Sequence, residues 1–223
     1  MDDLKPEIES VTVVLVGDFN PAIFHPAWFA HQKLIQQEEA DRASVKIVSP
    51  DLSVFSIGWL ALEVVSERFA VQTTQMQYVD ALRDFVTGTF GLLRHTPVKF
   101  MGVNRAAHFR SPDETTWHNL GHRLAPKEEW ETVLKKPGMR KLQILGQRPD
   151  QFRGNLNVTV EPSQMFRPGF GVLFDINDHY DNDVEGKGRE CERMMEILVT
   201  AWQISLDRSL RIAQTIVQPR EPR

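Results

Sequence analysis

Histidines and aspartates in the second half of the chain are the residues best suited to catalysis or metal binding. His118 and His122 are four residues apart, so a helix would place both imidazoles on one face, where they could chelate a transition metal. His179 is the nearest candidate for a third ligand. No glutamate follows His118 to act as a base, and Gly121 weakens a helix at this point. We therefore interpret this segment as a polar surface loop.

Residues 181–192 approach the pattern of an EF-hand calcium-binding loop. Asp181, Asp183 and Glu192 stand at the first, third and last positions, where such a loop supplies carboxylate ligands. Arg189 is a cation near the end of the loop, and the residues before it have the pattern of a strand instead of a helix. These mismatches favour an acidic loop without calcium, and the sequence predicts neither a metal nor a cofactor.

Cys191 is the only cysteine, so no internal disulfide can form. Glu190 and Glu192 flank it and disfavour the thiolate that a catalytic cysteine needs. We interpret Cys191 as a structural residue. A single cysteine also suits a reducing compartment, and no apolar run in the first twenty residues is long enough to span a membrane. The sequence therefore predicts a cytoplasmic protein without a membrane partner.

The leading functional hypothesis is a non-catalytic subunit that binds another protein, or itself, in a bacterial multi-component system. It rests on the absence of a catalytic motif, on ordinary surface charge and on a long amphipathic helix at the end of the chain. The expected contact residues are apolar and come from the beginning and the end of the chain: Trp28, Leu210, Ala213 and Ile216.

Two alternatives remain open. An enzyme would require folding to bring together the histidines and aspartates of the second half, namely His118, His122, His179, Asp175, Asp178 and Asp181. RNA or DNA binding would use the basic residues of segment 135–153, which are Lys135, Lys136, Arg140, Lys141, Arg148 and Arg153. The formal net charge of −4 argues against nucleic acid as a partner.

The elements that would position these residues follow from hydrophobic periodicity. In the first half we expect a strand at 11–18, a helix at 27–37 and two strands at 44–57 and 59–73. A second helix at 75–93 and a strand at 97–110 follow. This order predicts a ferredoxin-like βαββαβ unit. In the second half we expect a polar stretch at 111–123 and a short helix at 126–135. Three strands at 139–146, 151–160 and 168–176 and a long helix at 188–217 follow.

The 223 residues, 41% of them hydrophobic, suit a single α+β domain. Its halves would be residues 1–110 and 111–217, followed by a frayed tail, 218–223, that contains two prolines.

Three of these elements carry a resemblance to a known family. They are the helix with Phe85 and Phe90 that leads to a strand with Gly102, the strand 172–176 (VLFDI), and the long last helix. Over roughly the last two-thirds of the chain they resemble a sporadically distributed, uncharacterised bacterial protein family. Residues 104–107 are Asn-Arg-Ala-Ala, where that family has an Arg-Tyr-x-Asn pattern. The resemblance implies an α+β fold and no established activity.

Overall fold

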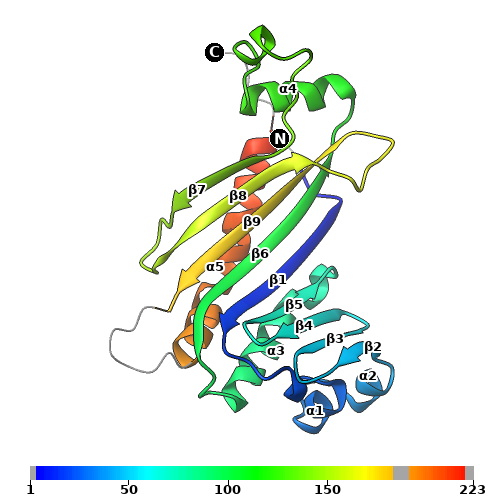
Figure 1. Ribbon diagram of the computed structural model, residues 1–223, viewed down its shortest axis with the longest axis vertical. Coiled ribbons are helices and arrows are strands. Elements are labelled where there is room, and N and C mark those ends of the chain that lie inside the picture. Colours follow the sequence, from blue (N-terminus) through cyan, green and yellow to red (C-terminus); the bar gives the residue numbers. More distant parts are fainter. Residues whose placement is uncertain (1–3, 183–190, 219–223) are drawn as a thin grey trace.

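The computed structural model describes residues 4–182 and 191–218. In this part of the chain nine strands form one antiparallel sheet in the order β2-β3-β4-β5-β1-β6-β9-β8-β7 (Figure 1). The strands are β1 (Ile8–Gly17), β2 (Ser44–Val48), β3 (Leu52–Ile57), β4 (Leu60–Val65), β5 (Arg68–Thr73), β6 (Val98–Arg110), β7 (Leu142–Gln147), β8 (Gly154–Pro162) and β9 (Gly171–Asp181).

Five α-helices and three short 3-10 helices accompany the sheet in the described residues. The α-helices are α1 (Pro26–His31), α2 (Gln37–Asp41), α3 (Val79–Leu92), α4 (Glu114–Leu124) and α5 (Glu192–Val217). The 3-10 helices are η1 (Pro21–Ile23), η2 (Met76–Tyr78) and η3 (Trp130–Thr132). None of the described helices is both long enough and apolar enough to cross a membrane.

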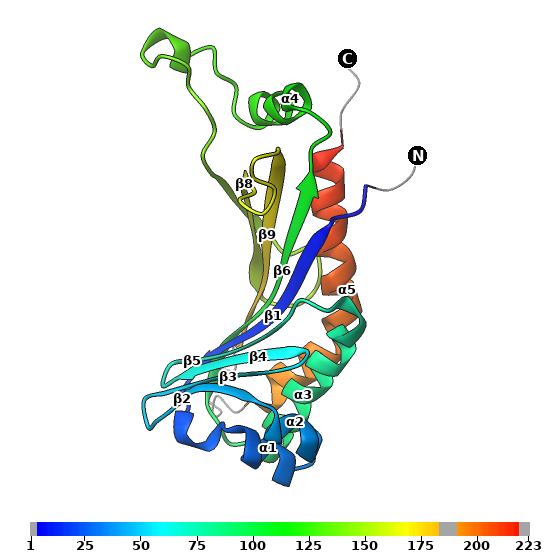
Figure 2. The ribbon, with the colours of Figure 1, turned by 90° about the vertical axis from the view of Figure 1, so that its right-hand side faces the viewer.

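Helices α1, α2, α3 and α5 lie on one side of the sheet, and α4 lies at its end (Figure 2). The alternation along β1 explains this arrangement, because Val11, Val13 and Leu15 are buried towards the helices, whereas Thr12 between them is partly exposed. The opposite face of the sheet has no helix over it among the described residues, and we call it the open face.

The buried side chains form two apolar clusters on the helical side. The larger cluster joins β1 and β3–β6 to α1, α3 and the first half of α5, which contributes Leu198 and Trp202. The smaller cluster joins the upper ends of β6, β8 and β9 to Ala213 of α5 and Leu120 of α4. Helix α5 therefore packs against both halves of the sheet, and β6 and β9 pair along almost their whole length.

The structure confirms the α+β class, the long last helix and the three strands that precede it. It does not confirm the ferredoxin-like unit, because the chain forms four strands between α2 and α3 instead of two. Each predicted strand there is a hairpin, β2–β3 and β4–β5. The first hairpin turns at Ser49, whose hydroxyl oxygen accepts a hydrogen bond of 3.1 Å from the amide of Leu52. The chain reverses completely at this point, so the predicted strand 44–57 is two antiparallel strands.

Two predictions between β6 and β7 were wrong. The polar stretch 111–123 contains helix α4, whose first turn is capped by Asp113, because its carboxylate accepts a 2.6 Å hydrogen bond from the amide of Thr116. The helix predicted over residues 126–135 is reduced to the single turn η3. Residues 125–141, which we call the arm, project away from the sheet between α4 and β7 (Figure 2).

Candidate functional site

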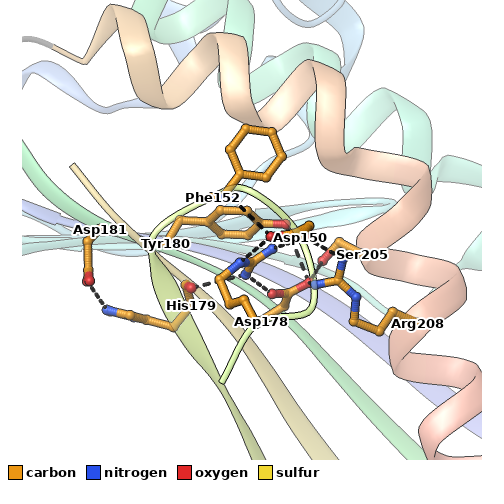
Figure 3. A network of polar contacts seen from close by, with 9 residues as sticks. Asp150, Phe152, Asp178, His179, Tyr180, Asp181, Ser205 and Arg208 are labelled. Carbon is orange, nitrogen blue, oxygen red and sulfur yellow. Dashed lines mark hydrogen bonds and ion pairs between the residues drawn. The ribbon is translucent and has the colours of Figure 1, made fainter. Parts of the chain in front are cut away.

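A buried ion pair lies between the sheet and α5. Arg148, in the turn between β7 and β8, bonds through its guanidinium to the carboxylate of Asp178 on β9, and both side chains are 1% exposed. The same guanidinium lies 3.7 Å from the ring centroid of Tyr180 and donates a 3.1 Å hydrogen bond to the carbonyl of His179. Figure 3 shows how these side chains converge beneath α5.

A second pair of opposite charges completes this arrangement, which we call the charged network. Asp150 accepts two hydrogen bonds from Arg148, at 3.0 and 2.8 Å, and one from Arg208 of α5. Arg208 also bonds to Asp178 at 3.3 Å, and the hydroxyl of Ser205 donates to Asp178 at 2.6 Å. Two arginines and two aspartates thus balance in charge, and each makes at least two polar contacts.

The charged network connects three segments of the chain through ion pairs and hydrogen bonds. The turn between β7 and β8 contributes one arginine and one aspartate, β9 contributes the second aspartate, and α5 contributes the second arginine. Desolvation alone would raise the pKa of Asp150, but the hydrogen bonds from Arg148 and Arg208 outweigh it and hold that pKa below its usual value. Because every charge is engaged by another protein group, the geometry supports a structural role.

The aspartates and the histidine of β9 do not form one catalytic site. Asp178 faces α5, whereas Asp175, His179 and Asp181 have the opposite parity on the strand and lie on the open face. The His179 imidazole and the Asp181 carboxylate are 2.9 Å apart. The sheet itself therefore separates Asp178 from its predicted catalytic partners.

His118 and His122 lie on α4, at the end of the sheet, with their ring centroids 6.3 Å apart. They line a groove of about 390 Å³ together with Trp117, Glu161 and residues of the arm, and an adjoining hollow of about 960 Å³ contains Arg140 and Arg167. None of the predicted residues of β9 lines either hollow. In the described residues, the histidines of α4 and the predicted catalytic residues of β9 therefore do not line a common pocket.

Metal binding finds no support among the described residues, which contain no cluster of three histidine, cysteine, aspartate or glutamate side chains suited to an ion. Most of the calcium-like segment, residues 183–190, lies outside the described residues. Cys191 is buried before α5, and its thiol lies 3.2–3.5 Å from the carbonyl oxygens of Phe90, Leu93 and Arg94. This burial agrees with a structural cysteine.

The basic segment 135–153 is divided by the fold. Arg148 is buried in the charged network, so it is not available to a phosphate. Lys135, Lys136, Arg140 and Lys141 are exposed on the arm. The exposed basic surface is thus smaller than the sequence indicates.

The residues expected to contact a partner lie largely inside the domain. Ala213 has no exposed surface, and Ile216 packs against the smaller apolar cluster. Leu210 is half-buried, and Trp28 is half-buried with its ring 5.0 Å from that of Phe29. The apolar stripe at the end of α5 therefore continues along the sheet instead of projecting beyond it. An interaction surface has to be sought elsewhere.

Three exposed apolar side chains lie close together on the arm. Trp130, Val133 and Leu134 surround η3, and they are 56%, 74% and 53% exposed. At the base of the arm the ammonium of Lys127 bonds to the carbonyl of Ala125 and lies 3.5 Å from the carbonyl oxygen of Gly121 in α4. The three apolar side chains form the tip of the arm, and they belong to neither apolar cluster.

Strand β7 is a second exposed apolar segment, at the edge of the sheet. It pairs with β8 in an unbroken register, and no other described strand adjoins it. Ile144 and Leu145 point to opposite faces and are 54% and 69% exposed. No residue from Leu142 to Gln147 is charged or proline.

The opposite edge, β2, has a different character. Lys46 lies in its centre, a bulge interrupts its register between Val45 and Ile47, and Pro50 follows in the turn. Charge, bulges and proline are the features that keep edge strands from pairing with other chains. Each edge strand is followed by a proline, Pro50 or Pro149, but only β2 carries a charge and a bulge within the strand.

Sequence reasoning missed both surfaces. The signal for β7 was present, since its uncharged residues LQILGQ stand between Lys141 and Arg148. The signal for the arm was the apolar trio Trp130, Val133 and Leu134, which lies within the short helix predicted over residues 126–135.

Comparison with known proteins gives no assignment, because no family model and no curated protein matches the chain.

Proposed function

We propose that this chain is a non-catalytic subunit that binds another protein through the tip of the arm. The observation that carries the proposal is the exposure of Trp130, Val133 and Leu134 on a segment that projects from the sheet. Burying one such side chain contributes about 1.5–3 kcal/mol, and aromatic anchors dominate many protein interfaces.

The geometry of the arm suits a segment that inserts apolar side chains into a partner protein. The turn η3 orders Trp130 and Val133 through a 3.1 Å backbone hydrogen bond between them, so part of the ordering cost of binding is met in advance. Exposed lysines at positions 135 and 136 and glutamates at 128, 129 and 131 surround the apolar residues. An apolar centre with a charged rim is typical of protein interfaces.

Three further parts of the proposal concern the setting of this subunit. The single, buried cysteine supports a cytoplasmic location. The long helix α5 and the strand β9 support membership of the sporadically distributed bacterial family. A role in a bacterial multi-component system is the third part, and it rests on the long amphipathic helix α5 and the exposed arm.

A quantitative pull-down from the source organism tests the proposal. The tagged full chain is expected to recover one protein at a constant ratio, and Trp130→Ser with Val133→Ser should abolish its recovery. The matched control is Val199→Ser with Ile204→Ser on α5, where both side chains are similarly exposed, at 57% and 54%.

The control should retain the partner at the ratio seen for the unmodified chain. Equal recovery by the arm variant and the unmodified chain would contradict the proposal, as would the absence of any reproducible partner. Circular dichroism of both variants establishes that they are folded.

A further inference from the structure

We further propose that the larger hollow beside α4 binds an aromatic phosphate, a small molecule of the class represented by a nucleoside monophosphate. Figure 1 shows α4 and the connection between β8 and β9, which both line this hollow, at the same end of the sheet. Its volume of about 960 Å³ corresponds to a space about 10 Å across, which suits a ligand of this size. The tip of the arm does not line it, so the inference is independent of the proposed protein partner.

Two arginines without partners line the hollow. Arg140 comes from the end of the arm and Arg167 from the connection between β8 and β9, and both are exposed. The side chain of neither makes an ion pair or a hydrogen bond with another described residue, whereas Arg148 and Arg208 are engaged by aspartates. A guanidinium presents its N–H donors in a planar fork that matches the oxygens of a phosphate. The two arginines are therefore available to hold one phosphate group.

Two aromatic rings form another wall of the hollow. The rings of Trp117 and Phe170 have their centroids 5.6 Å apart, and both side chains are half-buried. The indole Nε1 of Trp117 donates a 3.0 Å hydrogen bond to the carbonyl of Gly171, which fixes the orientation of the ring. A planar ligand ring stacks on such a wall without the entropic cost of ordering a mobile side chain. The wall thus supplies the aromatic half of the site.

The connection that carries Arg167 and Phe170 is held in place at its base. The amide of Ser163 donates a 2.9 Å hydrogen bond to the carbonyl of Gly171, which joins the two ends of the connection. The Ser163 side chain is 4% exposed, and its hydroxyl lies 2.8 Å from Nδ1 of His108 on β6. Both ends of this segment are therefore fixed to the sheet before a ligand binds, which lowers the cost of binding.

Glu161 determines how the ligand lies in the hollow. Among the described residues it is the only acid that lines this space, and it also lines the adjoining groove together with Trp117. Its carboxylate repels a phosphate, which places the phosphate towards the arginines and the planar ring towards Trp117. An amino group on that ring would donate a hydrogen bond to the carboxylate. Adenosine monophosphate (AMP) has all three features and is the probe of choice.

Isothermal titration calorimetry of the full chain tests the inference. We expect AMP to bind saturably at one site per chain. Adenosine lacks the phosphate and ribose 5-phosphate lacks the ring, so each should bind at least tenfold more weakly than AMP. The absence of AMP binding would overturn the inference, and so would equal affinities for AMP and ribose 5-phosphate.

Substitutions of exposed arginines locate the site without disturbing the core. Arg140→Gln with Arg167→Gln should weaken AMP binding at least tenfold, because the phosphate loses both guanidinium partners. The matched control is Arg42→Gln with Arg211→Gln, since these side chains are also exposed and without an ion pair, and the change in net charge is the same. The control should bind AMP like the unmodified chain. Equal weakening in both variants would show only general electrostatic attraction and would overturn the site.

Two further measurements separate this site from other surfaces. The indole N–H resonance of Trp117, assigned by its loss in Trp117→Phe, should shift on addition of AMP, and an unchanged resonance under saturating AMP would overturn the inference. A hexa-adenylate without a terminal phosphate should bind no more tightly than AMP. Tenfold tighter binding would indicate an RNA surface and would overturn a site for a small molecule. The variant Trp130→Ser with Val133→Ser should bind AMP normally, so the outcome here and that of the pull-down are distinguishable.

Discussion

Arg148 and Asp178 are thirty positions apart in the chain, yet they form an ion pair with almost no exposed surface beneath α5. Burying two charges is costly, and the cost is offset only where further hydrogen bonds satisfy each group. Here Asp150, Ser205 and Arg208 supply those bonds. The pair joins the turn after β7 to β9, two strands further into the sheet.

Asp178→Asn is expected to destabilise the protein by about 3–5 kcal/mol, because it leaves Arg148 buried with one partner fewer. The measurement is urea unfolding at neutral pH. The double variant Arg148→Met with Asp178→Leu should be much less destabilised, since it leaves Arg208 and Asp150 as a balanced pair. The exposed Asp207→Asn is the control and should be close to the unmodified protein. Equal losses for all variants would contradict a role for this network.

The charged network should also make stability depend on acid pH. The pKa of Asp150 is lower in the folded protein than in the unfolded chain, because the bonds from Arg148 and Arg208 outweigh the desolvation of its carboxyl. Its contribution is therefore fully present above the unfolded pKa, near 3.8, and is lost as pH falls through the lower folded value. Urea midpoints at several pH values below neutrality measure this dependence.

In Asp150→Asn the protein should be less stable at neutral pH, and its stability should fall less steeply than that of the unmodified chain below about pH 4. Identical slopes for the two proteins would show that Asp150 is not held in its charged form by the arginines.

Trp202→Ala is expected to cost about 3–5 kcal/mol, because the indole is almost fully buried in the larger cluster. Its Nε1 also donates a 3.0 Å hydrogen bond to Asp80 of α3. Trp202→Phe loses this bond and leaves a smaller cavity than alanine does, so its cost should be lower, about 2 kcal/mol. Thermal and urea unfolding of both variants give their free energies of unfolding. Equal losses in the two variants would show that packing of the indole contributes little to stability.

Periodicity predicted the long elements well. The stripe through Leu198, Trp202 and Ala213 predicted α5, and the short apolar runs in β1 and β9 predicted strands. Helix α4 was missed because its residues have weak helix propensity and Gly121 interrupts them. Its cap, Asp113, is a local signal that could have been used.

The charged network could not be predicted, because it depends on contacts between segments far apart in the chain. Arg148 resembled one more surface cation, and Asp178 resembled a catalytic acid. One clue was available: Asp178 shares the parity of the apolar residues Ile176 and Tyr180, so a carboxylate at that position would be buried and would require a cation. No local sequence pattern indicated which cation would pair with Asp178.

Helix α5 has a consequence for the cooperativity of unfolding. It packs against both apolar clusters, and β6 and β9 pair across the boundary between residues 1–110 and 111–217. Neither half can lose its structure without exposing apolar surface of the other. Calorimetry should therefore show one transition whose van't Hoff and calorimetric enthalpies agree, and neither half should be obtainable as an independently folding fragment.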